Sequence, residues 1–394
     1  MSISGNELAL DPRAFSGAEY DRRLNGLRAA MSDRGLAAVV VFSPESIYYL
    51  AGLNHQGYFA FTMLVVPLEG EMTIVARRME STTIAAQVRG ARHHAFGDDE
   101  DPAAAAATAL LDTVGPRDRV AFETDSMYCP VSVWQRMADR LSEIDRVDGS
   151  GLVAALRAIK SPEEITRVRR VARISSLAMA AGIEAVGSGV PETEVAAAVS
   201  SAMIRAGGEH PGFVPLIRSR DLLLHEHVSW HDRTIVPGDA MFMEFSASVG
   251  RYHAPISRMV YVETAPPGTD VAAGIAAEGL HAVREALVPG ARSADVYAAW
   301  QRVVDAGLGH DRYRRHHCGY MVGIGFPPSW VGGSSVVGLR AGGDLEIREG
   351  MTFHVLSWLL DQKPADFVIS DTVLVTADGG EILTDSPRDP IVKR

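Results

Sequence analysis

The sequence has only two cysteines, Cys129 and Cys318, among its 394 residues. So few cysteines exclude a disulfide framework, and the absence of any Cys-x-x-Cys pair excludes the commonest zinc motif. The sequence contains no run of about 18 apolar residues, and residues 1–13 have no basic stretch followed by an apolar one. We therefore expect neither a membrane span nor export, and a cytoplasmic location.

Basic residues are fewer than acidic ones, 38 against 49, which gives a formal net charge of −11. A chain of this charge has no overall positive field to attract phosphates, so we expect no nucleic-acid partner. With 47% hydrophobic and 22% charged residues, the composition is typical of globular proteins and excludes disordered or collagen-like architectures. The length is sufficient for two ordinary domains.

Helix and strand patterns alternate along the first part of the chain. The expected elements are a helix at 17–34, strands at 36–42, 61–66 and 72–75, and an alanine-rich helix that begins at Pro102 after the acidic run 98–101. The acidic run is interpreted as the N-terminus of that helix, where negative charge is stabilising. This order predicts a self-contained α/β domain over residues 1–155.

A second domain is expected over residues 156–394. Ser161 is followed by Pro162 and, three residues after the serine, by Glu164. This is the pattern of a capped helix N-terminus, so a helix is predicted to begin there. The short segment just before it is the natural connection between the two domains.

The second part of the chain contains an internal repeat. The matching segments are 189–198 with 290–299, 238–244 with 350–356, and 256–262 with 369–375. The first pair predicts two helix starts of one design, and the other two pairs predict duplicated strands. Two such units packed about a pseudo-twofold axis would gather side chains between the halves. We therefore expect the chemistry to lie between residues 210 and 376.

The second part of the chain also holds candidate catalytic residues. Its histidines include His225, His227, His253 and His354. Each is either structural or part of a site, because imidazole forms local hydrogen bonds as readily as it catalyses. Glu244 stands in the otherwise apolar pattern MFMEFSAS. It either has a structural partner or is desolvated, with a raised pKa, and poised as nucleophile or base. Leu356 at the equivalent place of the repeat favours the functional interpretation.

The segment 323–330 predicts a rigid turn that ends in an aromatic residue, Trp330. The indole face could line a pocket for a cationic substrate. The alternative is a loop that is packed by its own tryptophan.

Three motifs, LRAIKSPEEI at 156–165, HDRTIVPGD at 231–239 and GMTFHVLSWLL at 350–360, are specific when taken together. On these motifs the chain resembles, over nearly its whole length, the superfamily of creatinase, prolidase and methionine aminopeptidase. The resemblance implies a creatinase-like N-terminal α/β domain followed by a catalytic domain of the pita-bread fold. It also implies a homodimer in which the N-terminal domain of one subunit approaches the other subunit's site. Tyr58 is the candidate for that contact, although the aromatic residues around it could equally be domain core.

The metal-dependent members of that superfamily hold two ions with carboxylates and one histidine. The equivalent positions here are Glu244, Pro255, Val322, Leu356 and Ser370. Four of these five cannot bind a metal, so we expect no metal cofactor and no aminopeptidase or prolidase activity. In metal-free creatinase a histidine and two glutamates surround the substrate. Their equivalents are His227, Ser257 and Leu356, which disfavours creatine.

Residues 251–258 (RYHAPISR), the turn 325–330 and the motif GMTFH are similar to the metal-free ectoine hydrolase branch. The sequence departs from that branch after Trp330, where Val331, Gly332 and Gly333 replace an expected acid. The resemblance implies hydrolysis of a C–N bond in a small amidine, ectoine or hydroxyectoine. Alternative functions are a creatinase-like amidinohydrolase, an Xaa-Pro peptidase, or a catalytically inactive pita-bread domain that binds a protein.

The predicted roles follow from this chemistry. Glu244 is the nucleophile or the base that activates water, and His227 transfers a proton to the leaving nitrogen. His253 completes the catalytic set and, with Tyr252, is predicted to orient the reacting groups. The remaining predicted substrate contacts are Trp330, as a wall against the cation, and His225, His354 and Tyr58.

Overall fold

The computed structural model describes residues 15–333 and 336–394, in a first compact unit that ends at Arg157 and a second that begins at Ala158. The expectation for residues 1–13 therefore lies outside the described residues. Both cysteines are free. Among the helices in the described ranges, none is both long and apolar enough to cross a membrane.

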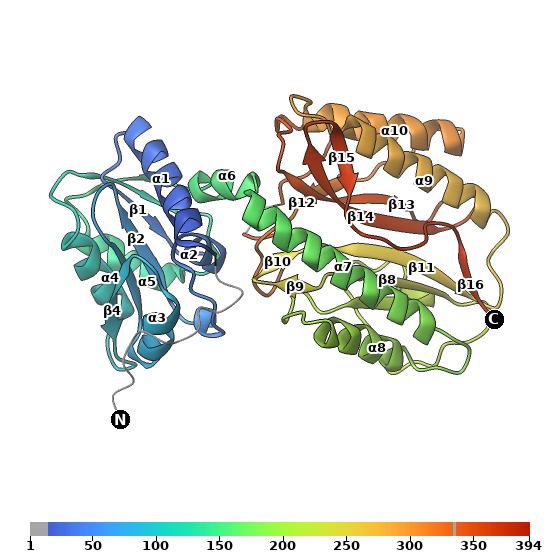
Figure 1. Ribbon diagram of the computed structural model, residues 1–394, viewed down its shortest axis with the longest axis horizontal. Helices are drawn as coiled ribbons and strands as arrows, with labels where there is room; N and C mark the ends of the chain where they lie inside the picture. Colours follow the sequence, from blue (N-terminus) through green and yellow to red (C-terminus); the bar gives the residue numbers. More distant parts are fainter. Residues whose placement is uncertain (1–14, 334–335) are drawn as a thin grey trace. The chain divides into compact units, whose positions relative to one another are not determined.

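The first unit is a six-stranded sheet with helices, as the alternation of patterns predicts (Figure 1). Its strands are β1 (Ala38–Val41), β2 (Met63–Pro67), β3 (Met72–Arg77), β4 (Ala91–Phe96), β5 (Arg119–Phe122) and β6 (Asp145–Asp148). Its helices are α1 (Gly17–Asp33), α2 (Pro44–Ala51), α3 (Ser81–Gln87), α4 (Pro102–Leu111), α5 (Val131–Arg140) and α6 (Leu152–Ala158), which ends at the unit boundary. The strand order is β4-β3-β2-β1-β5-β6. Asp101 caps α4 by accepting a hydrogen bond from the Ala103 amide, so the acidic run is a helix N-terminus as predicted.

The second unit is built on an eight-stranded sheet in the order β12-β13-β14-β11-β8-β7, with β15 added to β14 and β16 to β11. Its main strands are β7 (Leu216–Ser219), β8 (Ala240–Phe245), β11 (Ile256–Val262), β12 (Gly319–Met321), β13 (Thr352–Leu359), β14 (Phe367–Thr376), β15 (Gly379–Ile382) and β16 (Ile391–Lys393). A separate hairpin pairs β9 (Ser248–Val249) with β10 (Tyr252–His253). Its helices are α7 (Pro162–Ala185), α8 (Glu192–Arg205), α9 (Thr269–Ala286) and α10 (Ser293–Leu308). The fold class is confirmed.

The predicted repeat is visible in this sheet. The repeated segments form α8 and α10, β8 and β13, and β11 and β14. Strands β11 and β14 pair with each other where the halves meet, with Ser257 opposite Ser370. At the start of α7, Ser161 accepts from the Glu164 amide while the Glu164 carboxylate accepts from the Ser161 amide, so the capping box is confirmed.

Two of the helices determine which face of the sheet is left for a site. Helix α7 packs on β8 and β11, and α9 packs on β13 and β14 (Figure 1). Gly182 of α7 lies so close to β8 that an added Cβ would come within 2.9 Å of the Met243 sulfur. Successive residues of a strand point to opposite faces, so Phe242 and Glu244 point away from α7.

Candidate functional site

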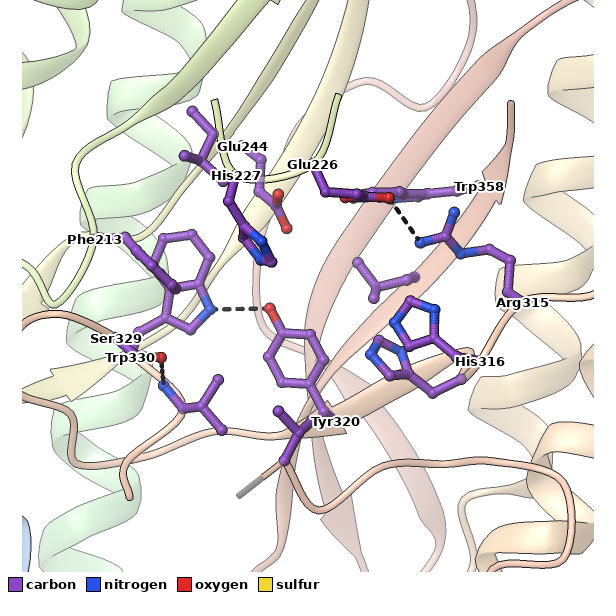
Figure 2. Close-up of a pocket in the computed structure, with 15 residues that line it drawn as sticks. Phe213, Glu226, His227, Glu244, Arg315, His316, Tyr320, Ser329, Trp330 and Trp358 are labelled. Atoms are coloured by element: carbon purple, nitrogen blue, oxygen red, sulfur yellow. Dashed lines mark hydrogen bonds and ion pairs between the residues drawn. The ribbon is translucent and has the colours of Figure 1, made fainter. Parts of the chain in front are cut away.

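A cavity of about 290 Å³ opens over the sheet face that carries Glu244 and Leu356 (Figure 2). This volume lies near the lower end of typical small-molecule sites and suits one small molecule. The residues that line it are Phe213, Leu216, Glu226, His227, Glu244, Arg315, His316, His317, Tyr320, Ser329, Trp330, Val331, Val336, Leu356 and Trp358.

A row of paired residues crosses the sheet beneath this cavity. Reading across the strands, Leu216 lies opposite Glu244, Glu244 opposite Ser257, Ser257 opposite Ser370, and Ser370 opposite Leu356. Glu244 and Leu356 occupy equivalent places on the two sides of the pseudo-twofold axis. Glu244 is the only carboxylate of the row, so the two halves of the site differ in charge.

Glu244 is buried, with 5% of its surface exposed, and its side chain has no hydrogen-bond partner among the described residues. Burial raises the pKa of this carboxyl to about 8, while the cations Arg218 and Arg315 partly oppose the rise and the carboxylate of Glu226 adds to it. A desolvated, unbonded carboxyl in a cavity is the environment in which an acid becomes a base or nucleophile near neutral pH. Of the two alternatives that the sequence left open for Glu244, its surroundings favour the desolvated carboxyl over one with a structural partner.

The raised pKa predicts how stability depends on pH. Between pH 4.5 and about 8 the folded protein keeps the Glu244 proton, whereas the unfolded chain has lost it. This contribution to stability is full below pH 4.5 and is lost as pH rises towards 8, at a rate of about 1.4 kcal/mol per pH unit. The free energy of unfolding of the wild type, measured by chemical denaturation from pH 5 to 8, should therefore fall relative to that of Glu244→Gln. Parallel pH profiles would contradict the burial of an ionisable group here.

A chain of hydrogen bonds runs from the cavity wall into the sheet. The Trp330 indole N–H donates to the Tyr320 hydroxyl (2.9 Å), which lies 2.9 Å from Nδ1 of His354. The other ring nitrogen, Nε2, lies 2.6 Å from the Ser370 hydroxyl. Burial lowers the pKa of His354 to about 3, so the ring is neutral and donates to one neighbour while accepting from the other. The predicted contact residue His354 thus lies behind Tyr320, with its Nδ1 3.8 Å from Oε1 of Glu244.

His227 and Trp330 both line the cavity, as the sequence-based roles require. The His227 ring is stacked on Phe213, with centroids 6.0 Å apart, and the rings of Phe213 and Trp330 form a T-shaped contact with centroids 4.7 Å apart. Figure 2 shows His227 and Glu244 pointing towards the same space beside the Tyr320 hydroxyl. His227 has a positive φ of 55°, an uncommon conformation that directs its side chain from an irregular segment.

The structure places Tyr252, His253 and His225 outside the residues that line the cavity. His253 is fully buried and its Nε2 accepts a hydrogen bond from the Gly212 amide (2.9 Å), next to the cavity residue Phe213. Tyr252 donates to Glu164 at the start of α7 (2.5 Å). His225 is exposed. The predicted catalytic and substrate-binding roles of these three residues stay predictions. Tyr252 and His253 form contacts within the fold, to Glu164 and to the Gly212 amide, that are typical of positioning residues.

Tyr58 belongs to the first unit and lies in a short 3₁₀ turn, Gly57–Phe59. It is half-buried and its ring meets that of Tyr128 edge-on at 6.3 Å. The predicted homodimer and the contact of Tyr58 with a second subunit's site stay predictions.

Several cavity residues were not predicted as site residues. Among them are Tyr320, Arg315 and Glu226. Arg315 and Tyr320 belong to the segment RRHHCGY, which has neither helical nor strand periodicity. The density of cationic and aromatic residues in this segment, which leads into β12, was the available signal, because loops held by a rigid sheet often carry function.

The residues present do not fit the two-metal centre that the superfamily implies. Of the five equivalent positions, Pro255, Val322 and Leu356 have no side-chain donor atom, and only Glu244 and Ser370 retain oxygen. Across residues 15–333 and 336–394, no three His, Cys, Asp or Glu side chains are grouped so as to hold a metal ion. Two divalent cations need a larger set of oxygen or nitrogen ligands than this.

Comparison with known proteins agrees with the two-unit architecture. Residues 166–377 match the model of metallopeptidase family M24, and residues 23–159 match the creatinase/prolidase N-terminal domain. The chain is 28% identical over 399 residues to the ectoine hydrolase of Halomonas elongata, covering 96% of this chain and 98% of that protein. It is 27% identical over 387 residues to the probable dipeptidase PepE of Mycobacterium tuberculosis, covering 96% of this chain and 98% of that protein. A solved prolidase from Thermococcus sibiricus superimposes with a TM-score of 0.85 at 22% identity, covering 96% of this chain and 100% of that one.

Proposed function

The chain belongs to metallopeptidase family M24, a family of hydrolases, and from this premise we propose that it hydrolyses a small cyclic amidine without a metal, with ectoine as the expected substrate. The observation that carries the proposal is the row of residues beneath the cavity. Glu244 is the one carboxylate in this row, whereas a two-metal centre needs several carboxylate ligands. The named activity of the Halomonas elongata relative supports the choice of substrate. A hydrolase with this site must use a side chain either as the nucleophile or as the base that activates water.

The cavity suits an amidinium cation. An amidinium is already electrophilic at carbon, so it needs no Lewis acid to accept an oxygen nucleophile. The aromatic faces of Trp330 and Phe213 can attract the cation, and its charge favours the ionised form of Glu244. Substrate binding thus converts a mostly protonated acid into the carboxylate that the reaction requires.

The proposed reaction adds one water across the amidine. Glu244 attacks the amidine carbon directly or takes a proton from the water that attacks it. The C–N bond of the resulting tetrahedral carbon then breaks, and His227 gives a proton to the departing nitrogen. Where Glu244 attacks directly, water then hydrolyses the bond between the Glu244 oxygen and the carbon and frees the carboxylate. By either route amidine and water become an amide and a free amine, so the ring opens with no oxidant or co-substrate. Tyr320 stands beside the reacting groups and is held there by Trp330 and His354.

The dipeptidase relatives suggest the competing function, cleavage of a peptide bond. A peptide carbonyl is less electrophilic than an amidinium, and family members that cleave it rely on two metal ions. The donor atoms for such a pair are missing here, as Val322 and Leu356 show. The site therefore supports amidine hydrolysis better than dipeptide hydrolysis.

A substrate comparison tests the proposal. Protein that has been treated with EDTA and dialysed should hydrolyse ectoine or hydroxyectoine as fast as untreated protein, and should leave creatine and Xaa-Pro dipeptides intact. Mass spectrometry would follow a product with the mass of substrate plus one water. Added Mn²⁺ or Zn²⁺ serves as the control and should not raise the rate. Turnover of the dipeptides alone, or activity that EDTA removes and metal restores, would overturn the proposal.

A further inference from the structure

Buried N–H donors without partners lie on the cavity side of the sheet. They are Nη1 and Nη2 of Arg218, Nε of Arg315 and Nε1 of Trp358, none of which has a hydrogen-bond partner among the described residues. Guanidinium and indole nitrogens can only donate. Buried polar groups are nearly always paired in folded proteins, so a cluster of unpaired donors calls for an acceptor that the chain itself does not supply.

Each of the two arginines lies over an aromatic ring, and these two rings contact each other. The Arg218 guanidinium lies 3.9 Å from the centroid of the Phe242 ring, and that of Arg315 lies 4.7 Å from the Trp358 ring. Phe242 and Trp358 meet edge-on at 5.2 Å, which joins the two stacks. Stacking of this kind fixes the plane of a guanidinium and leaves its N–H edge free for recognition.

Both arginines belong to the cavity side of the sheet. Arg315 and Trp358 line the cavity. Arg218 follows the lining residue Leu216 by two positions in β7, so both point to the same face of the sheet. Arg218 is 1% exposed, which makes its unpaired nitrogens inaccessible to bulk solvent.

The charges around this cluster leave an excess of positive charge. The carboxylate of Glu226 forms an ion pair with Arg315, with its Oε1 3.7 Å from Nη2 of Arg315, and the Glu226 side chain is 50% exposed. Glu244 also attracts Arg218, but the raised pKa of its carboxyl leaves it mostly uncharged near neutral pH. Two cations thus face one exposed carboxylate, and a single monoanion would balance them.

We infer that Arg218, Arg315 and the indole of Trp358 form a subsite for the carboxylate of the substrate. The inference rests on the proposed function and extends it, because it defines the substrate class as a small zwitterion rather than any amidine. The cationic end of such a molecule lies against Glu244 and Trp330, and its carboxylate accepts hydrogen bonds from the guanidinium pair. Guanidinium groups match the two oxygens of a carboxylate in spacing and charge.

The first test compares substrates that differ in one charge. Wild-type protein should show kcat/KM about 10- to 100-fold higher for ectoine than for its carboxamide, as expected for charge-assisted hydrogen bonds. Arg315→Gln should reduce this ratio to near one, mainly by lowering kcat/KM for ectoine. Arg312→Gln removes the same charge from an exposed neighbouring position and should keep the wild-type ratio. Equal kcat/KM for acid and carboxamide in the wild type would overturn the subsite and leave the proposed function standing.

The second test needs no turnover. Sodium propionate should raise the melting temperature of the wild type and of Arg312→Gln above the value in equimolar propionamide with sodium chloride. Arg315→Gln and Arg218→Met should lose this shift. Arg218→Met should melt no lower than the wild type without ligand, because it replaces a buried cation that has no ion-pair partner among the described residues by an apolar chain of similar length. No propionate-specific shift in the wild type would overturn the subsite. A shift that depends on the arginines in a protein that does not hydrolyse ectoine would support the subsite while the proposed function fails.

Discussion

Glu244→Gln is expected to lower kcat/KM for ectoine by about 10²–10⁴-fold while the protein stays folded. Glutamine has the shape of the uncharged carboxyl that the cavity holds near neutral pH, so the packing around it should not change. What the variant loses is the negative charge and the lone pair that attack carbon or accept a proton. Steady-state kinetics with purified protein, together with a circular dichroism spectrum equal to that of the wild type, measure this loss.

Two further measurements assign the loss to Glu244 itself. Glu226→Gln makes the same chemical change at a cavity residue whose side chain is half exposed, and it should alter kcat/KM by less than about tenfold. In the wild type, kcat/KM should rise by up to about tenfold per pH unit on the acidic side of its pH profile, because the carboxylate of Glu244 is the active form. Full activity in Glu244→Gln, or a wild-type kcat/KM that does not rise with pH on the acidic side, would refute its role.

Asp371→Asn is expected to produce the largest loss of stability, about 3–5 kcal/mol, because it leaves a buried arginine without its counter-charge. Asp371 is fully buried and accepts hydrogen bonds from Arg258 (3.0 Å), Thr384 (2.7 Å) and Arg388 (2.7 Å). Arg258 is 1% exposed and also donates to the Ser370 carbonyl. This network therefore ties β11 to β14 directly behind the row that holds Glu244.

Chemical denaturation at pH 7 would measure the effect. Asp389→Asn is the matched control, since it removes a carboxylate from an exposed position nearby and should change the free energy of unfolding by less than about 0.5 kcal/mol. A loss of stability in Asp371→Asn no larger than in this control would show that the buried pair contributes nothing net.

The sequence allowed prediction of the features that follow from local pattern. The capping residues of α7 are adjacent in sequence, and the apolar alternation of β8 makes Glu244 stand out. The internal repeat also aligns Glu244 with Leu356 from the sequence alone. Strand pairing then put both residues in one row across the axis. Features of this kind depend on short separations or on duplication, which a single sequence displays.

Other parts of the site depend on contacts between distant segments. Tyr252 and His253 stand in a distinctive motif, yet they bond to Glu164 and Gly212, 88 and 41 residues away. These long-range contacts determine where the side chains of Tyr252 and His253 point, and the local sequence pattern does not show them. Arg218 sits in a short strand whose pattern gave no sign that its guanidinium would be buried without a partner.

The difference in charge between the two halves of the row, Glu244 on one side and Leu356 on the other, affects which C–N bond of the substrate breaks. An amidine carbon in a ring has two C–N bonds, and opening either one gives a different constitutional isomer. Glu244 lies in one half of the row and Leu356 in the other. A zwitterion bound in the reverse orientation would place its carboxylate beside Glu244 and its cation beside Arg315, so like charges would repel at both ends. Under the proposed function, the loss of symmetry between two duplicated strands therefore makes the enzyme regioselective.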